Sequence, residues 1–437
     1  MGCHAHQKLA SIATSLDAKR LMAISLGTTR VIISSHPDTA KEILSGCSFS
    51  DRPIKESARL LMFERAIGFA PSGNYWRHLR RIAANHMFSP RRISCLESIR
   101  QHVANEMIEG VCREMNEKGF VEVKEILQKG SLHNVLVSVF GCDLGSIQGD
   151  ELGLMVKEGY EVISEFNLAD YFPFGFLDFR GVKRRCHKLA TKVKDLVGRS
   201  IDERRRNGVY EMQNDFLSLL LSLSKEEQIS DEDMVAVLWE MVFRGTDTVA
   251  ILLEWIMARM VLHQDIQAKA RSEIDVVTGR NGPVQDSDIA KLPYLQSIVK
   301  EVLRLHPPGP LLSWARLATH DTYVDKHFIQ AGTTAMVNMW SITHDPSIWT
   351  DPWAFRPERF IEEEVSIMGS DLRLAPFGSG RRVCPGKALG LVTVHLWLAR
   401  LLQQFKWVQS VQPVDLSECL KLSLEMKKPL ICHVVSR

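Results

Sequence analysis

One short glycine-rich stretch constrains the fold of this chain more than any other part of its sequence. Residues 376–386 read PFGSGRRVCPG, and they frame Cys384 with glycines, prolines, an aromatic side chain and two arginines. Small residues on both sides allow a flat partner to come close to the backbone. A helical pattern over residues 387–405 follows directly. The sulfur is therefore expected near the positive end of a helix, where a thiolate is stabilised.

The other cysteines give Cys384 no partner for a metal site. The chain has nine cysteines in 437 residues, an odd number, and none forms a CxxC pair. We therefore expect no disulfide framework and no zinc site, favour a reducing compartment, and predict that most cysteines are small buried apolar residues. A thiolate is a soft metal ligand. Because Cys384 stands alone, its metal must bring its other ligands with it, as haem iron does.

Outside this motif the pattern is mainly helical. Residues 75–277 are mostly helical, with polar loops expected near 204–214 and 224–233. Residues 234–262 are apolar but contain five charged side chains, so they predict one long buried helix and not a membrane span. A later helix must end before His306, because two prolines follow. Strands are expected at 21–27, 30–35, 322–324, 327–329 and 333–339.

No internal repeat or linker divides the sequence. We therefore expect a single domain over residues 1–437, mainly α with small β-sheets. The formal net charge of +2 gives no reason to expect a nucleic-acid partner. Neither a GxGxxG motif nor a P-loop is present, so electrons for a redox reaction must come from another protein.

The pattern formed by Phe377, Gly380, Arg382, Cys384 and Gly386 resembles the signature of the cytochrome P450 family. The similarity extends along the whole chain and implies the cytochrome P450 fold. It also implies a haem b cofactor whose iron is ligated by Cys384, with Phe377, Arg382 and Gly386 beside the cofactor.

Two further motifs follow the family order. EVLR supplies Glu301 and Arg304, and PERF supplies Arg359. The resemblance implies that these three residues form a buried charged triad that holds the scaffold of the cysteine loop. Buried charges need partners, and an arginine binds a carboxylate through two parallel hydrogen bonds.

Basic residues at family positions are expected to hold the haem propionates. WRHLR, which contains Trp76 and Arg80, resembles the WxxxR element, and its spacing directs both side chains the same way. By the same resemblance, Arg316 and Arg382 are expected to converge on the cofactor with Arg80.

RGTDT, residues 244–248, resembles the oxygen-activation element of the family's central helix. Gly245 allows a local distortion of that helix. The resemblance assigns proton delivery to dioxygen to Thr248 and Asp247.

Arg244 departs from the usual family pattern, and three roles are open. It pairs along the helix with Glu240 or Asp247, or it binds a substrate carboxylate, or it restricts access to the cavity. The longer segments around these motifs resemble a plant subfamily of KLUH and plastochron type, in which an arginine at this position is normal. That subfamily is linked to organ growth and leaf initiation, and fatty acids have been proposed as its substrates.

The expected substrate walls are largely apolar and favour a lipophilic substrate. They are residues 57–71, 167–179, 241–248 and 308–314 and the turn near Glu425. The aromatic segment 172–179 is an alternative site of peripheral membrane contact. The resemblance also implies an NADPH–cytochrome P450 reductase as partner, with a basic docking patch formed by Arg77, Arg81, Arg381 and Lys387.

Together these features predict a haem-thiolate monooxygenase that inserts one atom of O₂ into a small lipophilic molecule. Two alternatives stay open: a haem-thiolate isomerase or dehydratase, and an inactive truncated binding protein. The N-terminal membrane helix and proline-rich hinge usual in the family are missing, so a shortened product is expected. The resemblance implies the cytosolic face of the endoplasmic reticulum, with the cytosol as the alternative for an anchorless chain.

Overall fold

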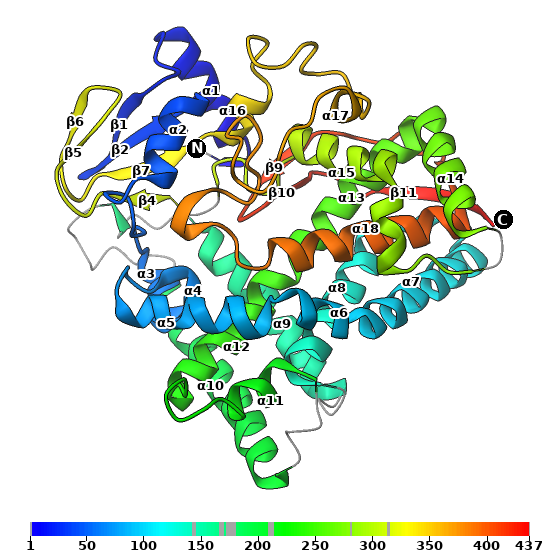
Figure 1. Ribbon diagram of the computed structural model, residues 1–437, viewed down its shortest axis with the longest axis horizontal. Coiled ribbons are helices and arrows are strands. Elements are labelled where there is room, and N and C mark those ends of the chain that lie inside the picture. Colours follow the sequence, from blue (N-terminus) through cyan, green and yellow to red (C-terminus); the bar gives the residue numbers. More distant parts are fainter. Residues whose placement is uncertain are drawn as a thin grey trace.

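The chain folds mainly as helices in a computed structural model, which describes residues 2–141, 146–165, 170–171, 181–208, 214–279, 282–312 and 315–436 (Figure 1). The first half contains α1 (Ala5–Ser15), α2 (Pro37–Ser45), α3 (Glu56–Leu61), α4 (Ala66–Phe69), α5 (Asn74–Ile82), α6 (Pro90–Cys95), α7 (Glu97–Lys118), α8 (Val123–Phe140), α9 (Ser146–Ser164) and α10 (Val182–Asn207). The second half contains α11 (Phe216–Leu221), α12 (Asp231–Gly245), α13 (Asp247–Leu262), α14 (Gln264–Thr278), α15 (Pro293–Leu305), α16 (Met339–Thr343), α17 (Arg359–Glu362) and α18 (Lys387–Gln404). Short 3₁₀ and π helices are η1 (Gly2–His4), η2 (Ala83–Met87), η4 (Asp286–Lys291) and η5 (Gly380–Arg382).

Small sheets complete the fold. The four-stranded sheet has the order β1-β2-β7-β4, in which β2 and β7 are parallel and the other neighbours antiparallel. It lies at one end of the molecule, next to α1 and α2 (Figure 1). Its strands are β1 (Met22–Leu26), β2 (Thr29–Ser34), β4 (Arg316–Leu317) and β7 (Thr334–Val337). The others are β3 (Val121–Glu122), β5 (Thr322–Val324), β6 (His327–Ile329), β8 (Phe405–Gln409), β9 (Glu418–Leu420), β10 (Leu424–Met426) and β11 (Ile431–Ser436).

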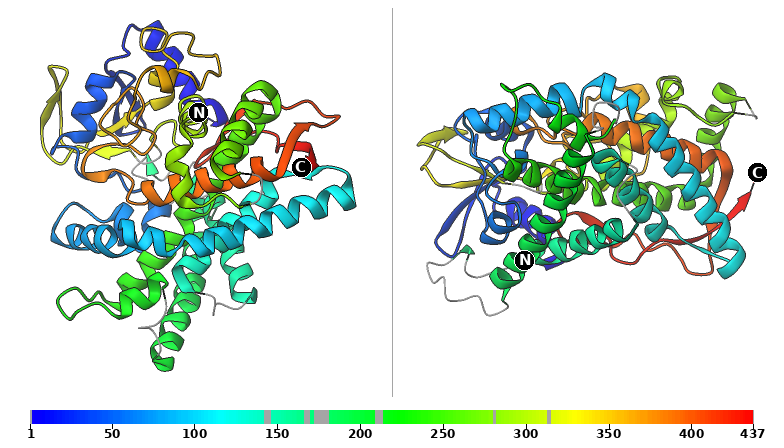
Figure 2. Two further views of the ribbon diagram at one scale, coloured as in Figure 1. Left: turned by 45° about the vertical axis from the view of Figure 1, so that its right-hand side comes forward. Right: turned by 90° about the horizontal axis from the view of Figure 1, so that it is seen from below.

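The largest core lies between the central helices. α13 packs against α8, α15 and α18, and α7 packs against α8 and α18 (Figure 2). Trp255 and Trp397 are fully buried there, and their indole N–H groups donate to the carbonyls of Leu424 and Arg100. Buried tryptophans need such partners. This core holds α13 and α18 in fixed positions on the two sides of the candidate site.

Most predicted elements are confirmed. The helix expected at residues 387–405 is α18, and α15 ends at Leu305 before the two prolines. The strands expected between residues 21 and 35 and between 322 and 339 are β1, β2, β5, β6 and β7. Ser230 caps α12 by accepting a hydrogen bond from the backbone N–H of Asp233. The loop expected at 204–214 begins later than predicted, because α10 continues to Asn207. Arg204 is buried in that last turn and forms an ion pair with Asp215.

The prediction of one continuous helix over 234–262 is wrong. α12 ends at Gly245 and α13 begins at Asp247. At the break, the carbonyl of Thr246 accepts a hydrogen bond from the Ser131 hydroxyl of α8, while the Thr246 hydroxyl donates to the Val242 carbonyl. Side-chain hydrogen bonds to backbone groups distort helices in this way. In the part of the chain that the structure describes, no helix is both long and apolar enough to span a bilayer.

The prediction that most cysteines are buried is also wrong. All eight described cysteines are free thiols, and of these Cys186 and Cys432 are buried. Four are exposed: Cys3, Cys47, Cys95 and Cys112. Cys112 follows the buried Val111 on α7, and successive residues on a helix point about 100° apart. Residue type alone therefore did not determine which of these side chains reach the core.

Candidate active site

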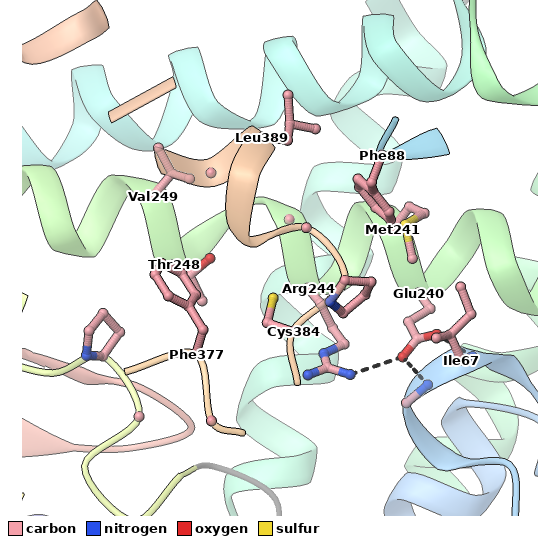
Figure 3. A pocket seen from close by; sticks show the side chains of 18 of the residues that line it. Ile67, Phe88, Glu240, Met241, Arg244, Thr248, Val249, Phe377, Cys384 and Leu389 are labelled. Carbon is pink, nitrogen blue, oxygen red and sulfur yellow. Dashed lines mark hydrogen bonds and ion pairs between the residues drawn. The ribbon is translucent and has the colours of Figure 1, made fainter. Parts of the chain in front are cut away.

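A cavity of about 320 Å³ lies between the α12–α13 pair, α8 and the loop before α18. Figure 3 shows Thr248, Arg244 and Cys384 around the same space. Phe377 and Gly386, both predicted beside the cofactor, also line it. The structure therefore brings the cysteine motif and the central helix elements together, as the sequence predicted.

The cysteine loop depends on glycines at two positions. Gly378 and Gly380 have positive φ angles of 71° and 67°, which glycine adopts without strain. A Cβ at Gly380 would also overlap the carbonyl of Leu44. The backbone N–H of Cys384 donates to the Phe377 carbonyl over 3.0 Å, and α18 begins three residues after Cys384. These constraints hold the sulfur at the cavity wall, near the N-terminus of α18.

Three predicted arginines gather at the cavity. Arg382 donates to the carbonyls of Ser50 and Ala70, and Arg316 donates to the carbonyl of Ser379. Burial lowers the pKa of Arg316 to about 9 and of Arg382 to about 10, and neighbouring arginines add to both shifts. Burial also lowers the pKa of Arg80. These lowered pKa values indicate that several guanidinium groups lie close together and are shielded from water.

This donor set fits a cofactor that carries carboxylates. The Nη1 atom of Arg382 is buried without a hydrogen-bond partner among the described residues. A buried donor without a partner costs free energy, which an anionic oxygen would recover. The cavity, its cysteine and its arginines are therefore chemically suited to haem, which has two propionates and takes a thiolate ligand.

Trp76 supports the arginines through its ring. The guanidinium carbon of Arg382 lies 4.3 Å from the centre of the Trp76 ring, and that of Arg80 lies 5.8 Å from it. The indole N–H donates to the Ile67 carbonyl over 3.0 Å. Trp76 thus stacks with two cations while its N–H bonds to backbone, a geometry that orients both arginines.

Sequence reasoning missed Arg52, which also lines the cavity. Burial, with Arg316 as the next cause, lowers the pKa of this guanidinium. Arg52 lies in the irregular segment between α2 and α3, where no periodic pattern marks a functional residue. The surrounding sequence SFSDRPIK, residues 48–55, predicts a turn and nothing more specific.

The predicted proton-delivery residues face different surroundings. Thr248 lines the cavity from the first turn of α13. Asp247 is half-buried, and its pKa is raised to about 6 by burial and by the nearby negative charge of Glu425. Lys124 and Lys421 oppose that rise. Asp247 is therefore able to exchange a proton near neutral pH on the side of the helix toward these charged residues.

Arg244 pairs with Glu240, one helical turn before it. Its Nη1 donates to Glu240 Oε1 over 3.0 Å, while Glu240 accepts the backbone N–H groups of Ile67 and Gly68 over 2.6 and 2.8 Å (Figure 3). A Cβ at Gly68 would overlap both charged groups. Arg244 also lines the cavity, and its side chain is 30% exposed. Of the three roles left open, pairing with Glu240 is the one observed in the structure.

The predicted charged triad is present and buried. Arg304 donates Nε and Nη2 to the two Glu301 oxygens over 2.8 Å each, and Arg359 Nε lies 3.1 Å from the same carboxylate. Arg304 also donates to the carbonyls of Thr343, Pro352 and Ala354. These bonds connect α15 and α17 to the irregular segment that precedes the cysteine loop.

The cavity walls agree in part with the predicted segments. Ile67, Met241, Pro308, Leu312 and Leu422 line the cavity from the segments 57–71, 241–248 and 308–314 and from the turn before Glu425. Residues 167–169, 172–179 and 313–314 lie outside the described residues, and the predicted membrane segment falls among them. No motif in the sequence marked the contribution of α8, from which Ser131, Asn134 and Val135 line the cavity.

Comparison with known proteins agrees with this geometry. The family model for cytochrome P450 matches residues 3–433. Cytochrome P450 78A5 of Arabidopsis thaliana is 56% identical over 447 residues, covering 100% of this chain and 86% of the relative. Cytochrome P450 78A3 of Glycine max is 51% identical over 443 residues, covering 99% and 84%.

More distant matches agree as well. Flavonoid 3'-monooxygenase of Arabidopsis thaliana is 33% identical over 462 residues, covering 99% of this chain and 88% of the relative. Among solved structures, a zebra fish cytochrome P450 with abiraterone superposes with a TM-score of 0.84 and 22% identity, covering 99% of both chains. The latter similarity bears on the fold alone.

Proposed function

This chain belongs to the cytochrome P450 family as a monooxygenase with a cysteine-ligated haem b, and we propose that Cys384 supplies the ligand. The relatives also identify it with the KLUH and plastochron type. One observation carries the assignment of Cys384: its side chain lines the same cavity as Thr248 and the buried arginines. We further propose that residues 1–437 form one catalytic domain, which the match of the family model over 3–433 supports.

The arginines at the cavity would hold the cofactor. Arg80, Arg316 and Arg382 are the propionate partners in this proposal, and Arg52 joins them because it is buried beside Arg316. Trp76 orients Arg80 and Arg382, while Phe377 and Gly386 lie on either side of Cys384. When bound, thiolate-ligated haem supplies reductive activation of O₂ and cleavage of its O–O bond. Glu301, Arg304 and Arg359 keep a structural role in the proposal.

The proton path follows from the different surroundings of two neighbouring residues. The Thr248 hydroxyl, at the cavity, would hold and donate the proton to dioxygen. Asp247 would replenish it from the side of Glu425 and Lys124, because its pKa of about 6 keeps both of its protonation states accessible. The Asp247–Thr248 pair argues against an isomerase or dehydratase, which needs no proton delivery to dioxygen.

The substrate in this proposal is a small lipophilic molecule. Ile67, Met241, Val249, Leu312 and Leu422 give the cavity apolar walls. Arg244 is a charged group in the wall that suits a carboxylate, which makes fatty acids the leading substrate class. The resemblance to the KLUH and plastochron type supports a role in plant growth or organ size.

The electron donor in this proposal is an NADPH–cytochrome P450 reductase. Arg77, Arg81 and Arg381 are exposed and Lys387 is half-buried, and together they would form the basic docking patch. By family resemblance we place the enzyme at the cytosolic face of the endoplasmic reticulum, in peripheral contact with the membrane.

The test compares the wild-type chain with Cys384→Ser and, as a control, Cys112→Ser, which alters an exposed cysteine on α7. Wild type and the control are expected to show the thiolate-type Soret band of the reduced, CO-bound protein and to form oxidised product with NADPH and reductase. Cys384→Ser is expected to lose both. Retention of both by Cys384→Ser would overturn the assignment of the ligand.

A further inference from the structure

Two cysteines from opposite ends of the sequence meet at the surface, apart from the active-site cavity. Cys3 lies in η1 and Cys419 in β9, and their sulfur atoms are 2.8 Å apart. That separation is within about 1 Å of the 2.05 Å of a formed disulfide. Cys3 is exposed and Cys419 is partly buried, so solvent-borne reagents have access to the pair.

Neighbouring buried residues hold the two thiols together. Glu418, next to Cys419, accepts a hydrogen bond from Gln7 over 2.9 Å and is hydrogen-bonded to the rings of His6 and His306 over 3.1 and 3.0 Å. The Asn338 side chain donates to the His6 carbonyl over 2.8 Å. These contacts fix the segment after Cys3 to the strand that carries Cys419, so the pair does not depend on a chance approach of two mobile side chains.

The two sulfurs have different chemical properties. Burial, followed by the contact with Cys3, raises the pKa of Cys419 to about 11, and the Cys419 thiol donates its hydrogen to the Cys3 sulfur. Cys3 is the exposed member and is the sulfur that an external disulfide reaches first. Thiol–disulfide exchange then needs a second thiol within bonding distance, which Cys419 provides.

We propose that Cys3 and Cys419 are a redox-active dithiol that a low-molecular-weight disulfide, such as oxidised glutathione, converts to an intramolecular disulfide. Cys3 displaces one glutathione and forms a mixed disulfide, and Cys419 then displaces the second glutathione as its proton passes to solvent. The two thiols lose two electrons in total, and oxidised glutathione is reduced to two molecules of glutathione.

The bond would connect the start of the chain to the wall of the active-site cavity. Cys419 lies in the β9–β10 hairpin, whose turn residues Leu422 and Ser423 line that cavity. The same hairpin is held on its other strand by the hydrogen bond from Trp255 to the Leu424 carbonyl. Oxidation would therefore restrict the movement of a cavity wall from a position outside the cavity.

The test incubates the protein of residues 1–437 in buffers of increasing oxidised-to-reduced glutathione ratio and maps its peptides by mass spectrometry without reduction. We expect a peptide pair linked through Cys3 and Cys419, which reduced glutathione reverses. The exposed single thiols Cys47, Cys95 and Cys112 are expected to carry glutathione instead. If Cys112 is glutathionylated while no Cys3–Cys419 link forms, the proposal is overturned.

Substitutions of the pair give a second measurement. In Cys419→Ser, Cys3 is expected to accumulate as its mixed disulfide with glutathione, because the thiol that resolves it is gone. Cys112→Ser is the matched control and should form the Cys3–Cys419 link to the wild-type extent. Equal amounts of glutathione on Cys3 in wild type and Cys419→Ser would also contradict the proposal.

Discussion

At the scale of single residues, Arg244 differs from the arginines near Cys384 because a carboxylate of its own helix partners it. Glu240 is 1% exposed and accepts the N–H groups of Ile67 and Gly68, which joins α12 to α4, while Arg244 pairs with the same carboxylate from one turn along α12. Nη1 of Arg244 donates that bond, and the side chain also lines the cavity. One side chain thus has both a structural contact and a position suited to a substrate carboxylate.

Replacing Arg244 with alanine separates these two roles. If the guanidinium binds a substrate carboxylate, Arg244→Ala should weaken the binding of fatty acids about tenfold or more, because a charge-assisted hydrogen bond contributes about 1.5–3 kcal/mol. The matching fatty alcohols should bind as they do to the wild type. Spectral titration with acid and alcohol pairs of equal chain length measures both affinities.

The control is Arg65→Ala, since Arg65 lies in the adjacent segment and pairs with Asp233 and Glu232. This variant should leave the ratio of acid to alcohol affinity unchanged. An equal loss for acids and alcohols in Arg244→Ala would show that the residue only braces the segment around Gly68.

At the scale of elements, the triad of Glu301, Arg304 and Arg359 joins two helices to irregular chain. Arg304 is fully buried and donates to one carboxylate and three backbone carbonyls. Removal of Arg304 leaves the Glu301 carboxylate and the backbone carbonyls buried without a hydrogen-bond donor. The free energy lost in this way is far larger than the net contribution of the intact ion pair. The triad therefore holds in place a segment that has little regular structure of its own.

Arg304→Ala is expected to lower the free energy of unfolding by about 3–5 kcal/mol. Haem content should fall with it, because the cysteine loop follows the segment that Arg304 holds. The matched control is Arg373→Ala, since Arg373 makes partly exposed ion pairs with Asp371 and Glu363 and should cost about 0–1 kcal/mol. Urea unfolding of both variants measures the difference, and similar costs would contradict the structural role of the triad.

Local motifs explain why so much of the site could be predicted from the sequence. Cys384, Thr248, Glu301 and Arg304 lie within short motifs that resemble those of the family, and the spacing in EVLR places Glu301 and Arg304 on one helix face. Gly245 indicated where the central helix could be distorted, but the break at Thr246 also involves a hydrogen bond from Ser131, more than one hundred residues earlier, which the local sequence could not predict. Arg52 likewise joins the cavity only through tertiary packing, and its own segment has no helical or strand period.

At the scale of the whole molecule, acid should destabilise the fold through buried histidines. Burial lowers the pKa of His306 to about 4, of His344 to about 3 and of His395 to about 4. In the unfolded chain these groups titrate near 6.5, so the unfolded state binds more protons as the pH falls from 6.5 toward 4. The contribution of each buried neutral histidine to the free energy of unfolding is fully present above pH 6.5. Below pH 6.5 it is lost at about 1.4 kcal/mol per pH unit.

Two acidic groups act in the opposite direction. Burial raises the pKa of Asp247 to about 6 and of Glu254 to about 7, so protonation of these carboxyls relieves a cost of folding as the pH falls.

A comparison of variants isolates the histidine effect. In His395→Gln, the loss of unfolding free energy between pH 7 and pH 5 should be smaller than in the wild type by about 2 kcal/mol.

The matched control is His102→Gln, because His102 is 68% exposed. It should show the wild-type loss of unfolding free energy between pH 7 and pH 5, measured by urea unfolding at both values. A His395→Gln loss indistinguishable from that of the control would show that His395 does not stay neutral in the fold.

The contacts of Glu418 also determine when the first helix can reach its final place during synthesis. His6 and Gln7 bond to a residue that is 412 and 411 positions later in the chain. At about 5–20 residues per second, a ribosome needs about 20–80 seconds to make that stretch. For this interval His6 and Gln7 lack the carboxylate that they bond to, whereas Leu9 and Ala13 on the apolar side of α1 can already pack on β1 and β2. The N-terminal helix and strands can therefore assemble early, and their connection to the β9–β10 hairpin forms last.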